Sequence, residues 1–82
     1  MITIMIHILP KKDILDPQGK TVLRALNNLG FHEVEEVRMG KLIKLNINSN
    51  NETESLEACK RMCDELLINP LIETYTMEVV HA

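Results

Sequence analysis

An alternation of isoleucines at the start of the chain constrains the fold more than any other feature. Residues 2–9 read ITIMIHIL, in which Ile alternates with Thr3, Met5, His7 and Leu9. Successive side chains of a strand point to opposite faces, so one face of this segment would be wholly aliphatic and the other half apolar. Two largely apolar faces are typical of a strand in the middle of a sheet.

A first helix is predicted over residues 17–29. Asp16 can accept hydrogen bonds from the free N–H groups of a helix start, and Pro17 suits the first helical position. Gly30 can take the left-handed conformation that ends a helix. The apolar stripe of this helix comprises Val22, Leu23, Leu26 and Leu29.

A second helix is predicted after the loop SNNET. Asn51 and Glu54 resemble a capping box, and Asn69-Pro70 stops the helix. Its expected buried stripe comprises Leu56, Cys59, Met62, Cys63, Leu66 and Leu67.

Three further strands complete the predicted layout. EVEEVRM, residues 33–39, is a weak strand because Val34 and Val37 lie three apart. Gly40 then allows a tight turn into KLIKLNIN, so the two segments are predicted to form a hairpin. TYTMEVV, residues 74–80, alternates like a final strand.

The order βαββαβ predicts an α+β fold and a single domain over residues 1–82. The expected architecture is a ferredoxin-like two-layer sandwich, an antiparallel sheet with both helices on one face. The open sheet face would carry Met5, Leu9, Leu42 and Val80. Exposing so apolar a face to water is unfavourable, so we expect a homodimer or a larger homo-oligomer in which this face packs against a second copy.

Composition excludes several classes of function. A net charge of -3 and an aromatic content of 2% argue against a basic nucleic-acid-binding face and against base stacking. The longest apolar run is too short to span a bilayer, and its flanks do not match a signal peptide. Two cysteines without an export signal predict a cytoplasmic protein.

No catalytic, cofactor-binding or metal site is predicted in this chain. PQGKT, residues 17–21, ends like a P-loop, but Ile14 stands where the motif needs its first glycine, so Gly19-Lys20-Thr21 is read as the first turn of a helix. Cys59 and Cys63 are read as two buried thiols. The histidines, His7, His32 and His81, show no spacing typical of zinc ligands.

Three motifs carry a family resemblance that covers nearly the whole chain. They are Asp16-Pro17-Gln18-Gly19, Val37-Arg38-Met39-Gly40-Lys41, and Asn69-Pro70-Leu71-Ile72-Glu73 with Tyr75. In their order and spacing they resemble the PurS family, the small subunits of phosphoribosylformylglycinamidine synthase.

The resemblance implies a non-catalytic assembly subunit that bridges two partners. The synthetase subunit PurL and the glutaminase subunit PurQ would supply the chemistry, using ATP, magnesium and glutamine to convert formylglycinamide ribonucleotide to formylglycinamidine ribonucleotide. Interface roles are assigned to Asp16, Gly19, Gly40, Lys41 and Tyr75. In these roles Asp16 caps the helix, Gly40 makes the turn and Lys41 reaches a partner carboxylate.

Two alternatives remain open from the residues alone. The same βαββαβ order occurs in regulatory modules of the ACT type, which bind small molecules between copies. The second alternative is a small enzyme such as an acylphosphatase. Such an enzyme needs an anion-binding loop with an arginine after the first strand, and the segment PKKDILD does not supply this loop.

Overall fold

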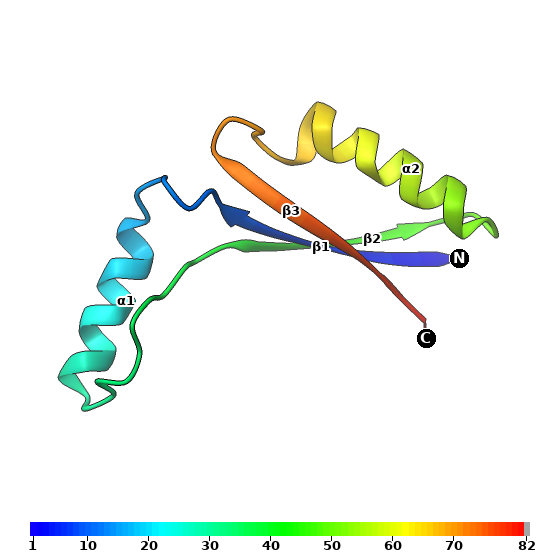
Figure 1. Ribbon diagram of the computed structural model, residues 1–82. Coiled ribbons are helices and arrows are strands. Elements are labelled where there is room, and N and C mark those ends of the chain that lie inside the picture. The colour runs from blue at the N-terminus through cyan, green and yellow to red at the C-terminus, as the bar shows by residue number, and fades with distance from the viewer. Residues whose placement is uncertain (82) are drawn as a thin grey trace.

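The computed structural model describes residues 1–81, and Ala82 lies outside them. Figure 1 shows a small twisted sheet, one helix lying along it and another projecting from its end. The elements in chain order are β1 (Ile2–Pro10), α1 (Pro17–Asn28), β2 (Lys41–Ile47), α2 (Glu52–Met62), the π-helical turn η1 (Cys63–Leu67) and β3 (Glu73–Val80). The α+β class is confirmed, and the chain follows the βαββαβ layout with three of its four strand segments in the sheet.

The sheet is antiparallel with strand order β2-β1-β3. The central position predicted for the first strand is confirmed, since Ile6 pairs with Ile43 on one side and with Met77 on the other. Ile4, Ile6 and Ile8 are buried on the face covered by α2. The alternation of isoleucines therefore does position the core.

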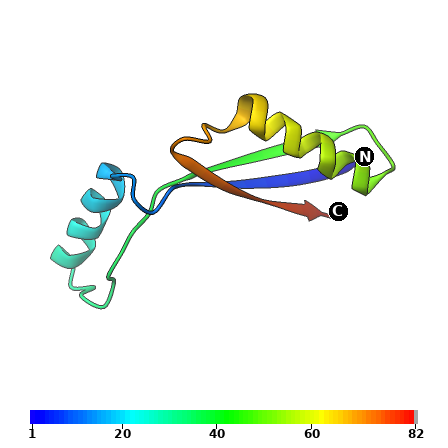
Figure 2. The same ribbon diagram turned by 45° about the horizontal axis from the view of Figure 1, so that its top comes forward.

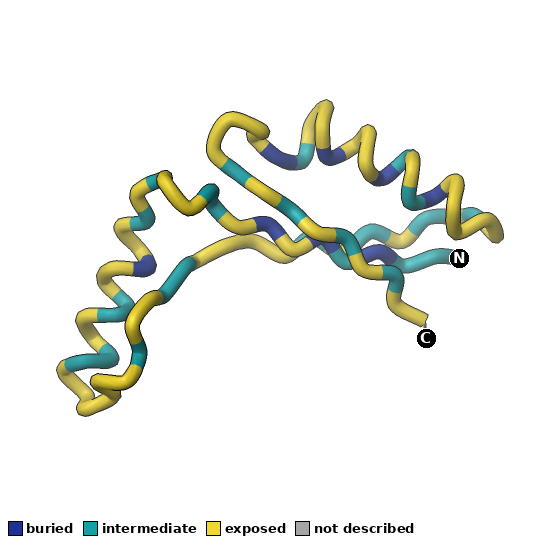
Figure 3. The backbone as a smooth tube through the Cα atoms, viewed as in Figure 1, coloured by how far each residue is buried: buried dark blue, intermediate teal, exposed yellow. Residues whose placement is uncertain are grey.

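The core lies between β1 and the helical segment α2–η1. It contains Ile4, Ile6, Ile8, Cys59, Cys63 and Ile68, with partly buried aliphatic residues of all three strands around it. Figure 3 shows that the dark blue, buried positions cluster on these elements, and that α1 carries a single one. That residue is Gly19.

Two residues of the predicted α2 stripe point outward. Leu66 is 81% exposed and Met62 is 39% exposed. In η1 the Ile68 N–H bonds to the Cys63 carbonyl, five residues back, at 3.1 Å. This wider turn keeps Leu67 against the core and rotates Leu66 toward solvent, which a regular 3.6-residue spacing does not predict.

The predicted hairpin between residues 33–39 and β2 is wrong. Residues 34–40 have no helix or strand assignment, and the chain runs on into β2 without a turn at Gly40. A side chain at Gly40 would collide with the Ile8 carbonyl, 2.1 Å from the position of a Cβ. The glycine therefore allows close approach of β2 to β1, and the turn role assigned to it is corrected.

The predicted placement of both helices on one sheet face is also wrong, because α2 alone covers that face. Figures 1 and 2 show α1 and the segment after it projecting past the end of the sheet, away from α2. We call residues 17–40 the arm. The radius of gyration is 16.1 Å, whereas a compact chain of this length has about 12 Å. Because no hairpin returns residues 33–39 to β2, α1 stays with that segment off the sheet.

Candidate functional site

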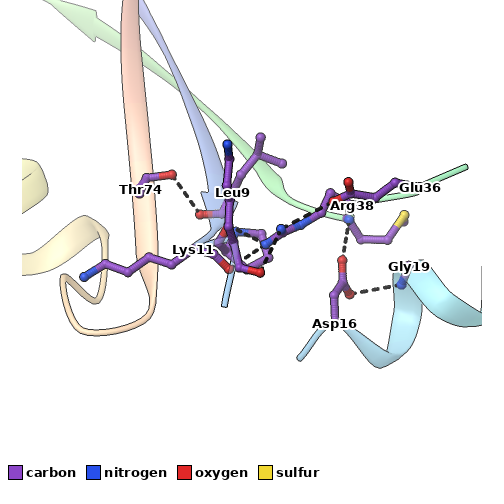
Figure 4. A network of polar contacts seen from close by, with 10 residues as sticks. Leu9, Lys11, Asp16, Gly19, Glu36, Arg38 and Thr74 are labelled. Atoms are coloured by element: carbon purple, nitrogen blue, oxygen red, sulfur yellow. Dashed lines mark hydrogen bonds and ion pairs between the residues drawn. The ribbon is translucent and has the colours of Figure 1, made fainter. Parts of the chain in front are cut away.

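The first two motifs of the sequence meet where β1 ends and the arm begins. We call this region, residues 10–19 and 36–41, the junction. Figure 4 shows its polar contacts, in which Arg38 and Asp16 connect the arm to the loop after β1. The third motif also lies beside the junction. The Lys11 N–H, in the loop after β1, donates to the carbonyl of Ile72, which directly precedes β3, at 2.8 Å.

Arg38 fastens the arm to the end of the central strand. Its Nη2 donates to the carbonyls of Pro10 at 2.7 Å and Lys11 at 2.6 Å. Its Nη1 lies 3.5 Å from the Lys12 carbonyl and 3.5 Å from Glu36 Oε1. A planar guanidinium with several fixed donors suits such a cluster of carbonyls. Arg38 belongs to the second motif, but the sequence predicts no role for it, since backbone acceptors leave no side-chain pattern.

Asp16 joins both ends of the arm. One carboxylate oxygen accepts from the Gly19 N–H at 3.0 Å, which confirms the predicted cap. The other accepts from the Met39 N–H at 2.7 Å. These two donors hold the pKa of Asp16 below its ordinary value of 3.8, so the carboxylate stays charged at neutral pH.

Gly19 allows a close approach between α1 and the extended segment of the arm. A Cβ there would lie 2.1 Å from the Val37 carbonyl and 2.7 Å from Asp16 Oδ2. Only a residue without a side chain lets α1 lie this close to the extended segment. The reading of PQGKT as a first helical turn is confirmed, because Thr21 Oγ1 donates to the Pro17 carbonyl at 2.9 Å.

Lys41 and Tyr75 make contacts inside their own chain. Lys41 Nζ lies 3.3 Å from Glu73 Oε2; the Lys41 side chain is exposed, whereas the Glu73 side chain is mostly covered. Glu73 Oε1 accepts from the Asn69 N–H at 2.7 Å, and this donor, more than Lys41, lowers the pKa of Glu73. The Tyr75 hydroxyl donates to Asp64 at 3.2 Å and ties β3 to η1. The interface roles assigned to Lys41 and Tyr75 stay predictions.

An open groove of about 410 Å³ runs along the junction. Its lining is of mixed charge: Lys12, Asp13, Ile14, Leu15, Asp16, Gly19, Lys20, Leu23, Glu35, Glu36, Val37 and Arg38. Within residues 1–81, no group of three His, Cys, Asp or Glu side chains is placed to hold a metal ion. Over the same residues, no helix has the length and apolarity needed to cross a membrane.

The two cysteines are buried and reduced, as predicted. Burial is the main cause that raises the pKa of Cys63 to about 11, and it also raises the pKa of Cys59. Both are therefore neutral thiols at pH 7, and neutral thiols are poor nucleophiles.

We expect neither cysteine to react with iodoacetamide in the native protein at pH 7, because both thiols are neutral and covered. In denaturant both should be alkylated within minutes. Mass spectrometry of native and urea-unfolded samples measures this directly. Rapid single alkylation of the native chain would contradict the assigned burial.

The fold and the junction define a class of protein: a small α+β module in which Arg38 and Asp16 fasten a helical arm to the end of a three-stranded sheet. The family model described as "PurS: Phosphoribosylformylglycinamidine (FGAM) synthase" matches residues 3–81. The chain belongs to this family, as its three motifs indicated.

Curated relatives and solved structures agree with this assignment. The PurS subunit from Methanocaldococcus jannaschii is 44% identical over 69 residues, covering 84% of this chain and 83% of the relative. That from Bacillus subtilis is 37% identical over 79 residues, covering 96% and 93%. The crystal structure of the M. jannaschii protein matches with a TM-score of 0.87 at 39% identity, covering 100% and 99%. A chain from the structure of PurLQS from Thermotoga maritima matches with a TM-score of 0.88 at 30% identity, covering 96% of both.

Proposed function

We propose that this chain is the non-catalytic assembly subunit of a phosphoribosylformylglycinamidine synthase, and that it joins the synthetase subunit PurL to the glutaminase subunit PurQ. The family match over residues 3–81 carries this proposal. The likeness to a chain of the T. maritima PurLQS structure supports it. The buried, neutral thiols support it as well, since neither can serve as a glutaminase nucleophile.

In this role the partner subunits carry the chemistry. They bind ATP, magnesium and glutamine and convert formylglycinamide ribonucleotide to formylglycinamidine ribonucleotide in the cytoplasm. This chain contributes docking surface, which includes the junction with Asp16, Gly19, Gly40 and Lys41. The Lys41 side chain is 68% exposed, so its ammonium can also reach a carboxylate of another subunit, whereas its partner Glu73 is only 13% exposed.

The open sheet face supports self-association. Strand register places His7 opposite Leu42 and Thr3 opposite Val80, so these residues share the face that α2 does not cover. On it Leu9 is 46% exposed, Leu42 58% and Val80 39%. We propose that this face packs against a further copy, as such apolar patches do in oligomers.

Co-elution tests the assignment against the regulatory module of the ACT type. The assembly subunit is expected to co-elute with PurL and PurQ from a sizing column and to show no thermal shift with free amino acids. Strong stabilisation by one amino acid, without co-elution, would favour the regulatory module. The family match does not support that alternative.

A further inference from the structure

The arm has almost no packed contact with the rest of the chain. We call the sheet, together with α2 and η1, the body. Within residues 1–81, α1 makes at most isolated contacts with the body, and Figure 2 shows it projecting clear of the sheet. The hydrophobic core contains no residue of the arm. The direction of the arm therefore depends on its two covalent connections and on the polar contacts of the junction.

Arg38 makes the side-chain contacts that reach from the arm to the end of β1. Within the described residues, the only side-chain hydrogen bonds between the arm and the remainder of the chain are those of Arg38 and Asp16. Asp16 accepts from two amides of the arm, so it closes the base of the arm on itself. Arg38 instead donates to Pro10, the last residue of β1, and to the loop residues Lys11 and Lys12 (Figure 4).

The chemistry of the guanidinium makes this contact directional. Nη2 carries two N–H groups, and two carbonyl oxygens lie within 2.7 Å of it, those of Pro10 and Lys11. Because all the donors lie in one plane, two bonds fix an angle as well as a distance. The Arg38 side chain is only 20% exposed, so the fork is held within the junction and does not extend freely into water.

A fixed arm matters for a subunit that joins two proteins. Large exposed apolar side chains occur on both parts of the chain, with Leu29 and Phe31 on the arm and Leu66 and Leu71 on the body. A bridge holds its partners at a constant separation only if its own parts do not swing. Ammonia released from glutamine on one partner must reach the other partner before it escapes into solvent.

We propose that Arg38 is a positioning residue of the assembled synthase. By holding the arm at one angle to the body, it keeps PurL and PurQ in the relative position that ammonia transfer requires. Arg38 touches no substrate and acts only through the direction of the arm. This inference rests on the proposed function of the chain and assigns one residue of the junction a role in the coupling of the two partners.

The glutamine-dependent rate of the reconstituted synthase tests this role, with Arg38→Ala and Arg38→Lys as the variants. At saturating amounts of Arg38→Ala we expect kcat with glutamine to fall about tenfold, because misplacement by about 1 Å can cost up to about a hundredfold. The KM for glutamine and the rate with ammonia should stay within about twofold of their original values, and more glutamate should form per product. Lysine keeps the charge but lacks the fork, so it should recover only part of the loss.

Arg24→Ala is the matched control, since it removes the same charge from an exposed position of α1. Circular dichroism verifies that each variant is folded, which we expect because the core lies entirely in the body.

The direction of the arm is measured separately, without the partners. Spin labels are attached through Asn28→Cys on α1 and Glu57→Cys on α2, two exposed positions, while the native cysteines are buried. Labelled chain is diluted with excess unlabelled chain, so that only distances within one chain are observed. We expect a narrow distance distribution with Arg38 and a distribution at least about twice as broad with Arg38→Ala.

Full glutamine-dependent turnover at saturating Arg38→Ala would overturn the proposal, even if more of the variant were needed to reach saturation. Equal distance distributions in the two chains would overturn it as well. If PurL and PurQ do not require the unsubstituted chain, the assembly function fails and the positioning role fails with it. If they require the chain and Arg38→Ala is fully active, only the positioning role fails.

Discussion

Replacing Gly40 with alanine is expected to destabilise the fold by about 1–3 kcal/mol, as overpacking against rigid neighbours does. The added methyl group would lie 2.1 Å from the Ile8 carbonyl and 2.8 Å from the Leu9 side chain. A backbone atom of the central strand cannot move aside as a flexible side chain can. Strands β1 and β2 must therefore separate at this end of the sheet.

Urea unfolding at matched protein concentration measures this effect. For a chain of this size the midpoint should fall by about 1–3 M, a large share of a small domain's stability. Asn48→Ala is the control, because Asn48 is exposed just after β2 and makes no hydrogen bond through its side chain within the described residues. A Gly40→Ala midpoint equal to or above that of the control would show that β2 does not approach β1 as described.

Replacing Gly19 with alanine is expected to release α1 from residues 36–39, although it improves the helix propensity of α1 by about 1 kcal/mol. The new Cβ would meet the Val37 carbonyl at 2.1 Å and Asp16 Oδ2 at 2.7 Å. Relief of that clash pulls the Asp16 carboxylate from the Met39 N–H, which it holds at 2.7 Å. We therefore expect a net destabilisation of the arm in a variant that helix propensity alone would favour.

Amide exchange of Met39 is the direct measurement, and it should accelerate at least about tenfold, the equivalent of one lost charge-assisted hydrogen bond. Gln18→Ala, an exposed change one residue away in the same helical turn, provides the control. Unchanged Met39 exchange in Gly19→Ala, together with a higher unfolding midpoint, would show that the close approach carries no constraint.

The sequence predicted those parts of the fold that local periodicity determines. The isoleucines of β1, the caps at Asp16 and Asn51 and the buried cysteines of α2 and η1 all lie where the alternation and helical spacing placed them. These features depend on contacts within one element or against one neighbouring face.

The failures came from contacts that local patterns do not describe. The predicted hairpin at Gly40 depended on a glycine that could serve either a turn or a close approach, and the structure uses it for close approach to Ile8. The position of α1 followed from that error. Leu66 was misplaced because a single π-turn changes the helical spacing. Arg38 was missed because its acceptors are backbone carbonyls.

The functional assignment had a different basis from the fold. Composition, charge and residue spacing argued against a catalytic site in this chain, but they did not indicate a function. The three motifs supplied the family, and the structure brings all of them to one end of the sheet. Their shared position supports a docking role for the junction.

Nitrogen-source dependence of the reconstituted synthase tests the assembly function most directly. PurL and PurQ from the same organism are assayed for formylglycinamidine ribonucleotide formation with glutamine or with ammonia, each with and without this chain. We expect the chain to be required at stoichiometric amounts when glutamine is the donor, and to have little effect when ammonia is supplied. Full glutamine-dependent turnover by PurL and PurQ alone would contradict the proposed assembly function.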